Sequence, residues 1–252
     1  MKHWIITIAA ILGLGLQLGA QTITEDNILS RIDEKLNFQS DFSCQFTMVT
    51  YRAGSEPTTQ QMSLFSRPEE IDGEEKFLAI VMKPDIDKGT GYLGQGDNYW
   101  IYDPESRRFS HSSARDSVQD SDMNNDDLGT ANFEDDYKVT AMTEGKLGQI
   151  DCWIVDLEAI RENVDYQNIK LWVGKKELLP YKEQDFSLTG TLMRTVLAPK
   201  WSLIEGKYIY RQVFFVDEIR RGNKTILLFD NVSLSSLPNH LFTKAYLEGS
   251  SR

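Results

Sequence analysis

The sequence predicts a mainly β protein, a meander of antiparallel strands with few helices. Short runs of alternating apolar and polar residues recur along its 252 residues, and turns rich in Pro, Gly, Asn or Asp separate them. No regular helical stretch lies between these runs, although the crossovers of a parallel sheet would require one. We find no internal repeat and no linker, so one domain is expected.

The first 20 residues have the pattern of a secretory signal peptide. Lys2 supplies a positive charge, residues 5–18 form an apolar core, and small residues precede a cut before Gln21. An uncleaved anchor is the alternative, but the apolar core is short for a membrane span. We therefore expect residues 1–20 to be a signal peptide and residues 21–252 to form the exported domain.

One amphipathic helix is predicted at the start of the mature chain. Thr24 can cap it, and Glu25 follows in its first turn, where negative charge is favourable. Ile28, Ile32 and Leu36 recur at helical spacing, so they share one face. We expect this face to pack against the sheet.

From residue 42 the apolar period changes to two. Phe42, Phe46 and Met48 alternate with polar residues, which predicts a strand with one apolar face. Residues 112–136 are rich in Ser, Asp and Asn. Their sequence fits either a short helix at residues 121–128 or a loop. Further strands are predicted at residues 62–66, 77–82, 99–102, 137–143, 150–160, 169–173, 178–186, 192–197, 208–219 and 225–234.

The composition limits the partners. The formal net charge is −11, which argues against binding to nucleic acid and against stable adsorption to anionic lipid surfaces. The two cysteines, Cys44 and Cys152, could pair in an oxidising compartment, or each could be a small buried apolar residue. Pairing requires Cα atoms within about 7 Å, and sequence alone does not decide it.

No motif indicates catalysis, a cofactor or a metal. Residues 89–94 match GxGxxG, but a strand follows them where a dinucleotide site needs a helix. Residues 120–131 begin like a calcium loop, yet Asn125 stands where Gly is required and Ala131 where Glu is required. The mature chain has two histidines and no GxSxG elbow. We therefore expect no enzyme activity, no cofactor and no metal.

One series of motifs resembles the outer-membrane lipoprotein-sorting family, the LolA-like carriers. It consists of a Lys-Gly pair, an aromatic W-x-Y strand, a proline turn and paired arginines. The acidic segment at residues 120–128 departs from the family pattern, because it lacks the usual Gly and aromatic residue. The matching positions are Lys88, Gly89, Leu93, Asn98, Trp100, Tyr102, Pro104, Arg107 and Arg108, followed by residues 165–173, 178–182, 222–225 and 237–242.

The resemblance implies an unclosed antiparallel β half-barrel with helices over its concave face. It also implies a periplasmic carrier that holds acyl chains of lipoproteins or another lipid and shuttles them toward the outer membrane. An inner-membrane transporter would be the donor and an outer-membrane protein the acceptor. Membrane contact would be transient, and we expect a monomer. Burial of acyl chains needs no reacting group, in agreement with the absence of a catalytic motif.

The predicted lipid-binding residues are those that fall on apolar strand faces or on the helix. Aromatic residues in strands are also common in ordinary cores, so a cell-envelope interaction module with a filled core is the alternative. A hydrolase acting on envelope lipids is a second alternative. The predicted set is Ile28, Ile32, Leu36, Phe42, Phe46, Met48, Leu64, Trp100, Tyr102, Trp153 and Trp172.

Overall fold

The computed structural model describes residues 22–37, 39–129, 132–162 and 164–250. The predicted signal peptide therefore lies outside the described residues. Within these ranges, no helix combines the length and the apolar character needed to cross a membrane.

One antiparallel sheet dominates the described part of the chain. Its thirteen strands follow the order β6-β5-β4-β3-β2-β1-β13-β12-β11-β10-β9-β8-β7, so β1 and β13 pair at its centre. The strands are β1 (Phe42–Tyr51), β2 (Thr58–Arg67), β3 (Lys76–Lys83), β4 (Gly91–Gln95), β5 (Asn98–Asp103), β6 (Arg108–Ser112), β7 (Tyr137–Leu147), β8 (Ile150–Ala159), β9 (Asn168–Gly174), β10 (Pro180–Phe186), β11 (Leu192–Ile204), β12 (Lys207–Asp217) and β13 (Lys224–Ser233).

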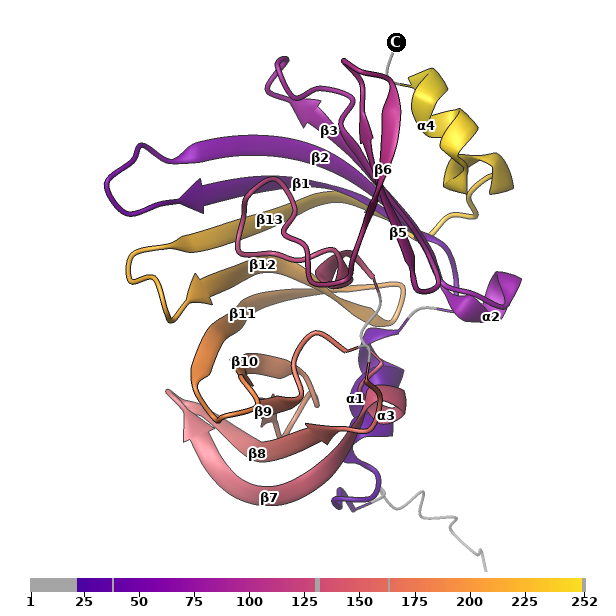
Figure 1. Cartoon of the computed structure of the whole chain (residues 1–252). Coiled ribbons are helices and arrows are strands. Elements are labelled where there is room, and N and C mark those ends of the chain that lie inside the picture. The colour runs from indigo at the N-terminus through magenta and orange to yellow at the C-terminus, as the bar shows by residue number, and fades with distance from the viewer. Residues whose placement is uncertain (1–21, 38, 130–131, 163, 251–252) are drawn as a thin grey trace, which may run out of the picture.

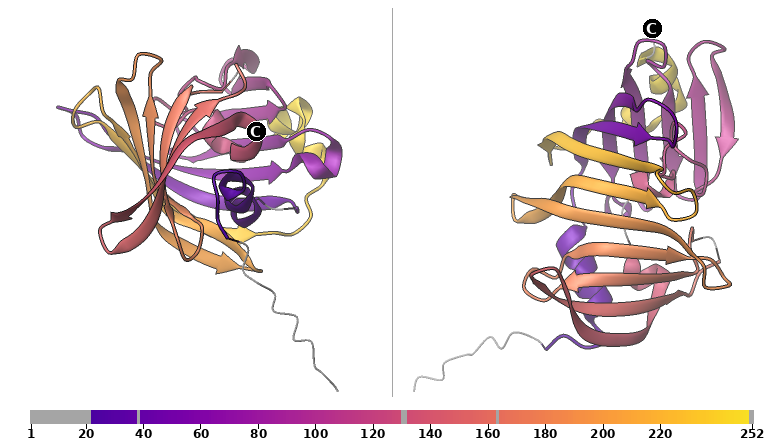
Figure 2. Two further views of the ribbon diagram at one scale, coloured as in Figure 1. Left: turned by 90° about the horizontal axis from the view of Figure 1, so that it is seen from below. Right: turned by 90° about the vertical axis from the view of Figure 1, so that its left-hand side faces the viewer.

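The sheet curves strongly but does not close. Its edge strands, β6 and β7, pair only with β5 and β8, and the two ends of the sheet stay apart (Figures 1 and 2). The sheet is thus the unclosed half-barrel that was predicted. The helical elements are α1 (Ile28–Leu36), α2 (Glu69–Asp72), α3 (Phe133–Asp136), α4 (Lys244–Ser250) and the 3₁₀ turns η1 (Asp126–Leu128) and η2 (Asn239–Phe242).

The predicted strands are present, but two strands were missed. β4 contains two glycines and β6 is polar, so neither has the alternating apolar pattern that the prediction used. The predicted Thr24 cap is wrong, because α1 begins at Ile28 after Asn27. The Asn27 side chain instead accepts a hydrogen bond from the backbone of Thr24, which makes a separate turn before the helix.

The two faces of the sheet have different covers. We call the concave face, on which Phe46 lies, the inner face, and the opposite one the outer face. α1 and α3 lie on the inner face against β8 and β9. η2 and α4 lie on the outer face of β3, β4 and β5, where they pack on Leu78, Ile80 and Leu93 (Figure 1). The helices therefore cover the concave face in part, as predicted, and the C-terminal helix covers the other side.

A buried ion pair attaches the C-terminal segment to the sheet. The Arg67 guanidinium lies 2.8 Å from the Asp41 carboxylate, and both side chains are nearly inaccessible to solvent. The same guanidinium donates to the side chain of Asn239 and to the backbone oxygen of Leu237. Its carbon lies 5.0 Å from the centre of the Phe242 ring. Such a pair requires these partners, because an unpaired buried charge is costly.

The two cysteines are free thiols. Cys44 lies in β1 and Cys152 in β8, and both are buried. Burial raises the pKa of the Cys44 thiol to about 12, so it is a poor nucleophile. The sequence left two interpretations open, a disulfide or two small buried apolar residues, and the structure shows the second.

Candidate functional site

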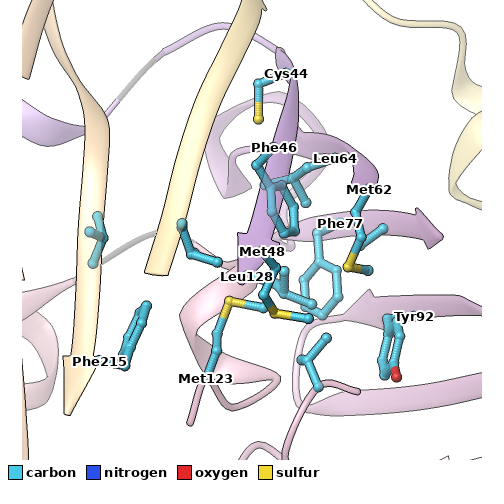
Figure 3. Close-up of a cluster of buried hydrophobic side chains, with 14 of the residues drawn as sticks. Cys44, Phe46, Met48, Met62, Leu64, Phe77, Tyr92, Met123, Leu128 and Phe215 are labelled. Atoms are coloured by element: carbon cyan, nitrogen blue, oxygen red, sulfur yellow. The ribbon is translucent and has the colours of Figure 1, made fainter. Parts of the chain in front are cut away.

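The inner face around β1 carries an apolar cluster, which we call the β1 cluster. Alternation along β1 and β2 directs one side chain in two to this face (Figure 3). The strands contribute Cys44, Phe46, Met48, Met62, Leu64, Phe77, Ala79, Val81, Tyr92, Ala198, Val213, Phe215 and Leu227.

The β1 cluster is covered by an irregular segment, residues 113–129, which we call the cover segment. It leaves the edge strand β6 and crosses the inner face toward α3 and β7 at the other edge. Val118, Met123 and Leu128 from this segment are 0, 1 and 3 % exposed. In Figure 3, Met123 and Leu128 point toward Met48 of β1. Burial of each such side chain contributes roughly 1.5–3 kcal/mol.

The backbone of the cover segment is folded on itself. The amide of Val118 donates to the oxygen of Met123 over 2.8 Å, and Ser117 forms an isolated bridge with Asn124. Among the described residues, its backbone-to-backbone hydrogen bonds stay within the segment. Each hydrogen bond between the cover segment and the sheet therefore involves a side chain on at least one side. The segment could separate without breaking a strand ladder.

The first polar attachment is at Arg52, just after β1. Its guanidinium lies 2.9 Å from the carboxylate of Asp122 and also donates to the backbone oxygen of Asp120. The hydroxyl of Thr225 on β13 donates to the Asp122 carboxylate over 2.8 Å and accepts from the Asp122 amide over 2.9 Å. This end of the cover segment is thus bound to two central strands.

The second polar attachment is at Arg194 on β11, which is 7 % exposed. Its guanidinium lies 2.7 Å from the Asp127 carboxylate of the cover segment and 2.6 Å from the Asp185 carboxylate of β10. The guanidinium carbon lies 5.0 Å from the ring centre of Tyr166 and 5.2 Å from that of Phe215. The neighbouring carboxylates raise the pKa of Arg194 well above its ordinary value. The cation therefore remains charged beside the β1 cluster, where two carboxylates are its partners.

Carboxyl groups around Arg194 outnumber this cation. Burial and the neighbouring Asp185 raise the pKa of Glu183 well above its ordinary value. Desolvation, followed by the charge of Asp127, raises the pKa of Asp126 to about 7. The Asp126 side chain is exposed in part and accepts a hydrogen bond from the Tyr99 hydroxyl over 3.3 Å. One carboxyl group of the cover segment therefore titrates near neutral pH.

A second apolar cluster, the α1 cluster, lies between α1 and the strands β8 and β9. Ile28, Ile32 and Leu36 are buried there, against residues that include Leu171 of β9. The Asp33 carboxylate on α1 accepts hydrogen bonds of 3.2 and 2.8 Å from the first two amides of α3. Burial raises the pKa of Asp33 to about 6 in spite of these bonds. α1 and α3 are therefore joined into one cover over this part of the face.

The structure places eight of the predicted lipid-binding residues on the inner face. They divide between two clusters, whereas the prediction treated them as one pocket. Phe42, Phe46, Met48 and Leu64 belong to the β1 cluster, and Ile28, Ile32, Leu36 and Trp153 belong to the α1 cluster. Their lipid binding remains a prediction.

The predicted position of three aromatic residues is wrong. Trp100 and Tyr102 lie on the outer face with Leu241, Phe242 and Leu247 of the C-terminal segment. Alternation groups the two aromatic residues on one face but does not say which face, and both faces of this part of the sheet are apolar.

Trp172 also points away from the inner face. Its neighbours Leu171 and Val173 are fully buried on the inner side, so alternation directs Trp172 outward. There the Lys182 ammonium lies 4.2 Å from its ring centre. The sequence of β9 already indicated this orientation. Ile169, Leu171 and Val173 alternate as three apolar residues on one face, whereas Trp172 shares the other face with Lys170.

A hollow of about 640 Å³ lies beside β10, β11 and β12, and four of its lining residues also belong to the α1 cluster or pack against it. Its walls combine aromatic and apolar side chains with three charged ones. The lining residues are Glu177, Leu179, Tyr181, Pro199, Lys200, Trp201, Tyr208 and Arg211. None of them was among the predicted lipid-binding residues.

A family model described as "Uncharacterized protein" matches residues 73–249, which include most of the sheet and the cover segment. The chain belongs to this family. No curated protein sequence matches the chain. The family match by itself does not indicate any activity.

Solved structures identify the fold. A LolA superfamily protein from Nitrosomonas europaea superposes with a TM-score of 0.77 at 23% identity, covering 89% of this chain and 100% of that one. A putative outer membrane lipoprotein-sorting protein domain from Vibrio parahaemolyticus gives 0.80 at 21% identity, covering 88% and 97%. A DUF1329 family protein from Desulfovibrio piger gives 0.81 at 22% identity, with the same coverage. The resemblance seen in the sequence is therefore confirmed as a LolA-like fold.

Sequence reasoning missed the residues that hold the cover segment. Arg194 is a single charge in the largely apolar run 192–197, Arg52 follows a strand, and the partners of both lie far away in the sequence. Val118 and Met123 are isolated apolar residues in an acidic stretch. Their isolation was the available signal, because a large apolar residue within a solvated loop usually packs on something.

Proposed function

We propose that the chain is a non-catalytic periplasmic carrier that binds acyl chains on the inner face and shuttles them toward the outer membrane. The cargo is a lipoprotein or another lipid. In this proposal residues 1–20 are removed on export and residues 21–252 act as a single domain. An inner-membrane transporter supplies the cargo and an outer-membrane protein accepts it.

One observation carries the proposal. A continuous apolar face on an open sheet is covered by an irregular segment that only side chains attach. The cover segment needs to release two arginine contacts, at Arg52 and Arg194, and three apolar side chains. It must also break its hydrogen bonds with Gln60, Tyr92, Tyr99 and Thr225.

The magnitudes favour exchange of the cover segment for lipid. Transfer of an acyl chain of about 14 methylene groups from water to an apolar face gains roughly 11 kcal/mol, at about 0.8 kcal/mol per group. The three apolar side chains of the cover segment contribute about 1.5–3 kcal/mol each. A lipid can therefore replace them on the β1 cluster and leave enough free energy to offset the lost polar contacts.

The fold supports this proposal by analogy. The similar domain from Vibrio parahaemolyticus is described as a putative outer membrane lipoprotein-sorting protein. The cover segment is acidic and is attached by arginines, which agrees with a cover that opens in water.

Lipid extraction tests the proposal. The mature protein would be incubated with vesicles of Escherichia coli polar lipids, separated from them and weighed by native mass spectrometry. We expect one lipid, or a small number, bound per chain. Phe46→Asp should abolish the bound mass, whereas Phe214→Asp on β12, at a half-buried position outside the apolar clusters, is the matched control. A wild-type protein that leaves the vesicles without lipid would exclude the carrier.

A second candidate is a cell-envelope interaction module with no lipid cavity. Val118, Met123 and Leu128 fill the space over the β1 cluster in this structure, which favours a permanent core. Hydrogen exchange separates the two candidates. A carrier should exchange the amides of residues 113–129 much faster than those of β1, whereas a permanent core should protect both equally.

A further inference from the structure

The strands β10 and β11 separate near one end of the sheet. Lys182 and Leu197 are their last paired residues, although β10 extends back to Pro180 and β11 forward to Ile204. The pairing of β11 with β12 shifts register twice at the same place, around Lys200. Bulges of this kind twist a strand and change the direction of its side chains. The hollow of about 640 Å³ lies at this irregularity.

The apolar wall of the hollow is fixed in place. The Trp201 indole donates its N–H to the backbone oxygen of Ala198 over 2.8 Å. The Trp201 ring stands edge-on to Tyr181, with 6.4 Å between ring centres, and lies 4.1 Å from the ring of Tyr210. Trp201 also contacts both the β1 cluster and the α1 cluster. One wall of the hollow is therefore a side chain that packs against both apolar clusters of the inner face.

The charged wall of the hollow is basic on balance. Lys200 and Arg211 face one carboxylate, Glu177, in a chain whose formal net charge is −11. Glu177 lies 3.3 Å from Lys176, and Arg211 lies 3.0 Å from the exposed Asp230. Lys200 is exposed and has no ion pair among the described residues. Lys200 is thus available to an anion at the mouth of the hollow, whereas Arg211 would have to exchange the exposed Asp230 for that anion.

We propose that this hollow binds the phosphate-bearing head group of an amphiphile whose acyl chains lie on the inner face. The inference rests on the proposed carrier function and specifies its cargo class. Lys200 supplies a point charge, and Arg211 supplies a planar set of donors that fits phosphate oxygens. The rings of Trp201 and Tyr208 lie at the boundary between chain and head group, a position that suits aromatic side chains with one polar end.

The test compares two lipids with identical chains. Phosphatidylcholine vesicles would contain equal amounts of dioleoylphosphatidylglycerol and dioleoylglycerol, and native mass spectrometry would count each lipid on the recovered mature protein. We expect about tenfold more phosphatidylglycerol than diacylglycerol, since charge-assisted hydrogen bonds add to the same chain burial.

The double variant Lys200→Gln with Arg211→Gln should reduce this preference to about twofold or less and leave diacylglycerol uptake unchanged. The control Lys138→Gln with Lys146→Gln removes two exposed cations from β7, far along the sheet, and should keep the preference. Glycerol 3-phosphate at millimolar concentration should not displace phosphatidylglycerol, because it lacks the chains that supply most of the binding.

Each outcome is decisive. Equal uptake of the two lipids by the wild type, an unchanged preference in the double variant, or displacement by glycerol 3-phosphate would overturn the head-group site and leave the carrier standing. Uptake of no lipid at all, phosphatidylcholine included, would overturn the carrier itself.

Discussion

The guanidinium of Arg194 on β11 lies 2.7 Å from the carboxylate of Asp127 in the cover segment. Asp185, on the neighbouring strand β10, shares the same guanidinium at 2.6 Å. One cation therefore joins the curved sheet to the segment that covers its apolar face. Because it is buried, this contact depends on both carboxylates being present and charged.

Arg194→Met should destabilise the protein by about 3–5 kcal/mol, since it leaves Asp185 and Asp127 without their counter-charge in a buried place. Urea unfolding followed by circular dichroism measures the change. Arg115→Met removes a mostly exposed arginine near Asp165 and should cost less than about 1 kcal/mol. Equal effects of the two substitutions would show that Arg194 is not a buried attachment point.

Met123→Ala should lower stability by about 2–5 kcal/mol and loosen the cover segment, because Met123 is 1 % exposed among the side chains of the β1 cluster. Binding of an apolar fluorescent dye should rise as the β1 cluster becomes accessible. Met82→Ala is the control, since Met82 is 41 % exposed. Dye binding that is the same in both variants would contradict the role of the cover segment.

Stability should fall as the pH rises from about 5 to 8. The pKa of Asp126 is raised to about 7 and that of Asp33 to about 6, so the folded chain retains protons that the unfolded chain has already lost. The resulting stability is present below the ordinary carboxyl pKa and is lost as the pH passes through these raised values. Thermal melts at pH 5.5 and pH 8 measure it. Asp126→Asn should raise Tm at pH 8 and reduce the difference; a Tm that increases with pH would contradict this assignment.

Two glycines of β4 should respond differently to substitution. A Cβ at Gly91 would meet Leu247 of α4 on the outer face, and a Cβ at Gly94 would meet the Phe77 ring on the inner face. Each change to Ala should cost about 1–3 kcal/mol through overpacking. Only Gly94→Ala should also alter lipid uptake. Reduced uptake by Gly91→Ala alone would mean that the outer face binds lipid.

These glycines also explain the GxGxxG match in residues 89–94. Gly91 and Gly94 are small because neighbouring side chains occupy the space, and a strand follows them, as the sequence predicted. A dinucleotide motif requires a helix at this point.

The strand faces were predictable where only one side is apolar. Phe46 and Met48 on β1 alternate with polar residues, so their common face was predicted correctly. Trp100 and Tyr102 were misplaced because the C-terminal segment covers the outer face locally, and a short-range pattern does not contain that long-range contact. The isolated apolar residues Val118 and Met123 indicated that the cover segment packs on something, but not where, because its attachment joins Asp127 to a residue 67 positions away.

A reversible lock on the cover segment tests the central claim most directly. The Asp122 amide lies 2.9 Å from the Thr225 hydroxyl, which limits the distance between their Cα atoms to about 7 Å and permits a disulfide in the variant Asp122→Cys with Thr225→Cys. Because Cys44 and Cys152 are buried, they should not compete. Lipid extraction from vesicles would be measured on the oxidised and the reduced variant. We expect the oxidised form to take up at most about a tenth of the wild-type lipid and the reduced form to recover it. Full uptake by the oxidised protein would contradict an inner face that must be uncovered to bind lipid.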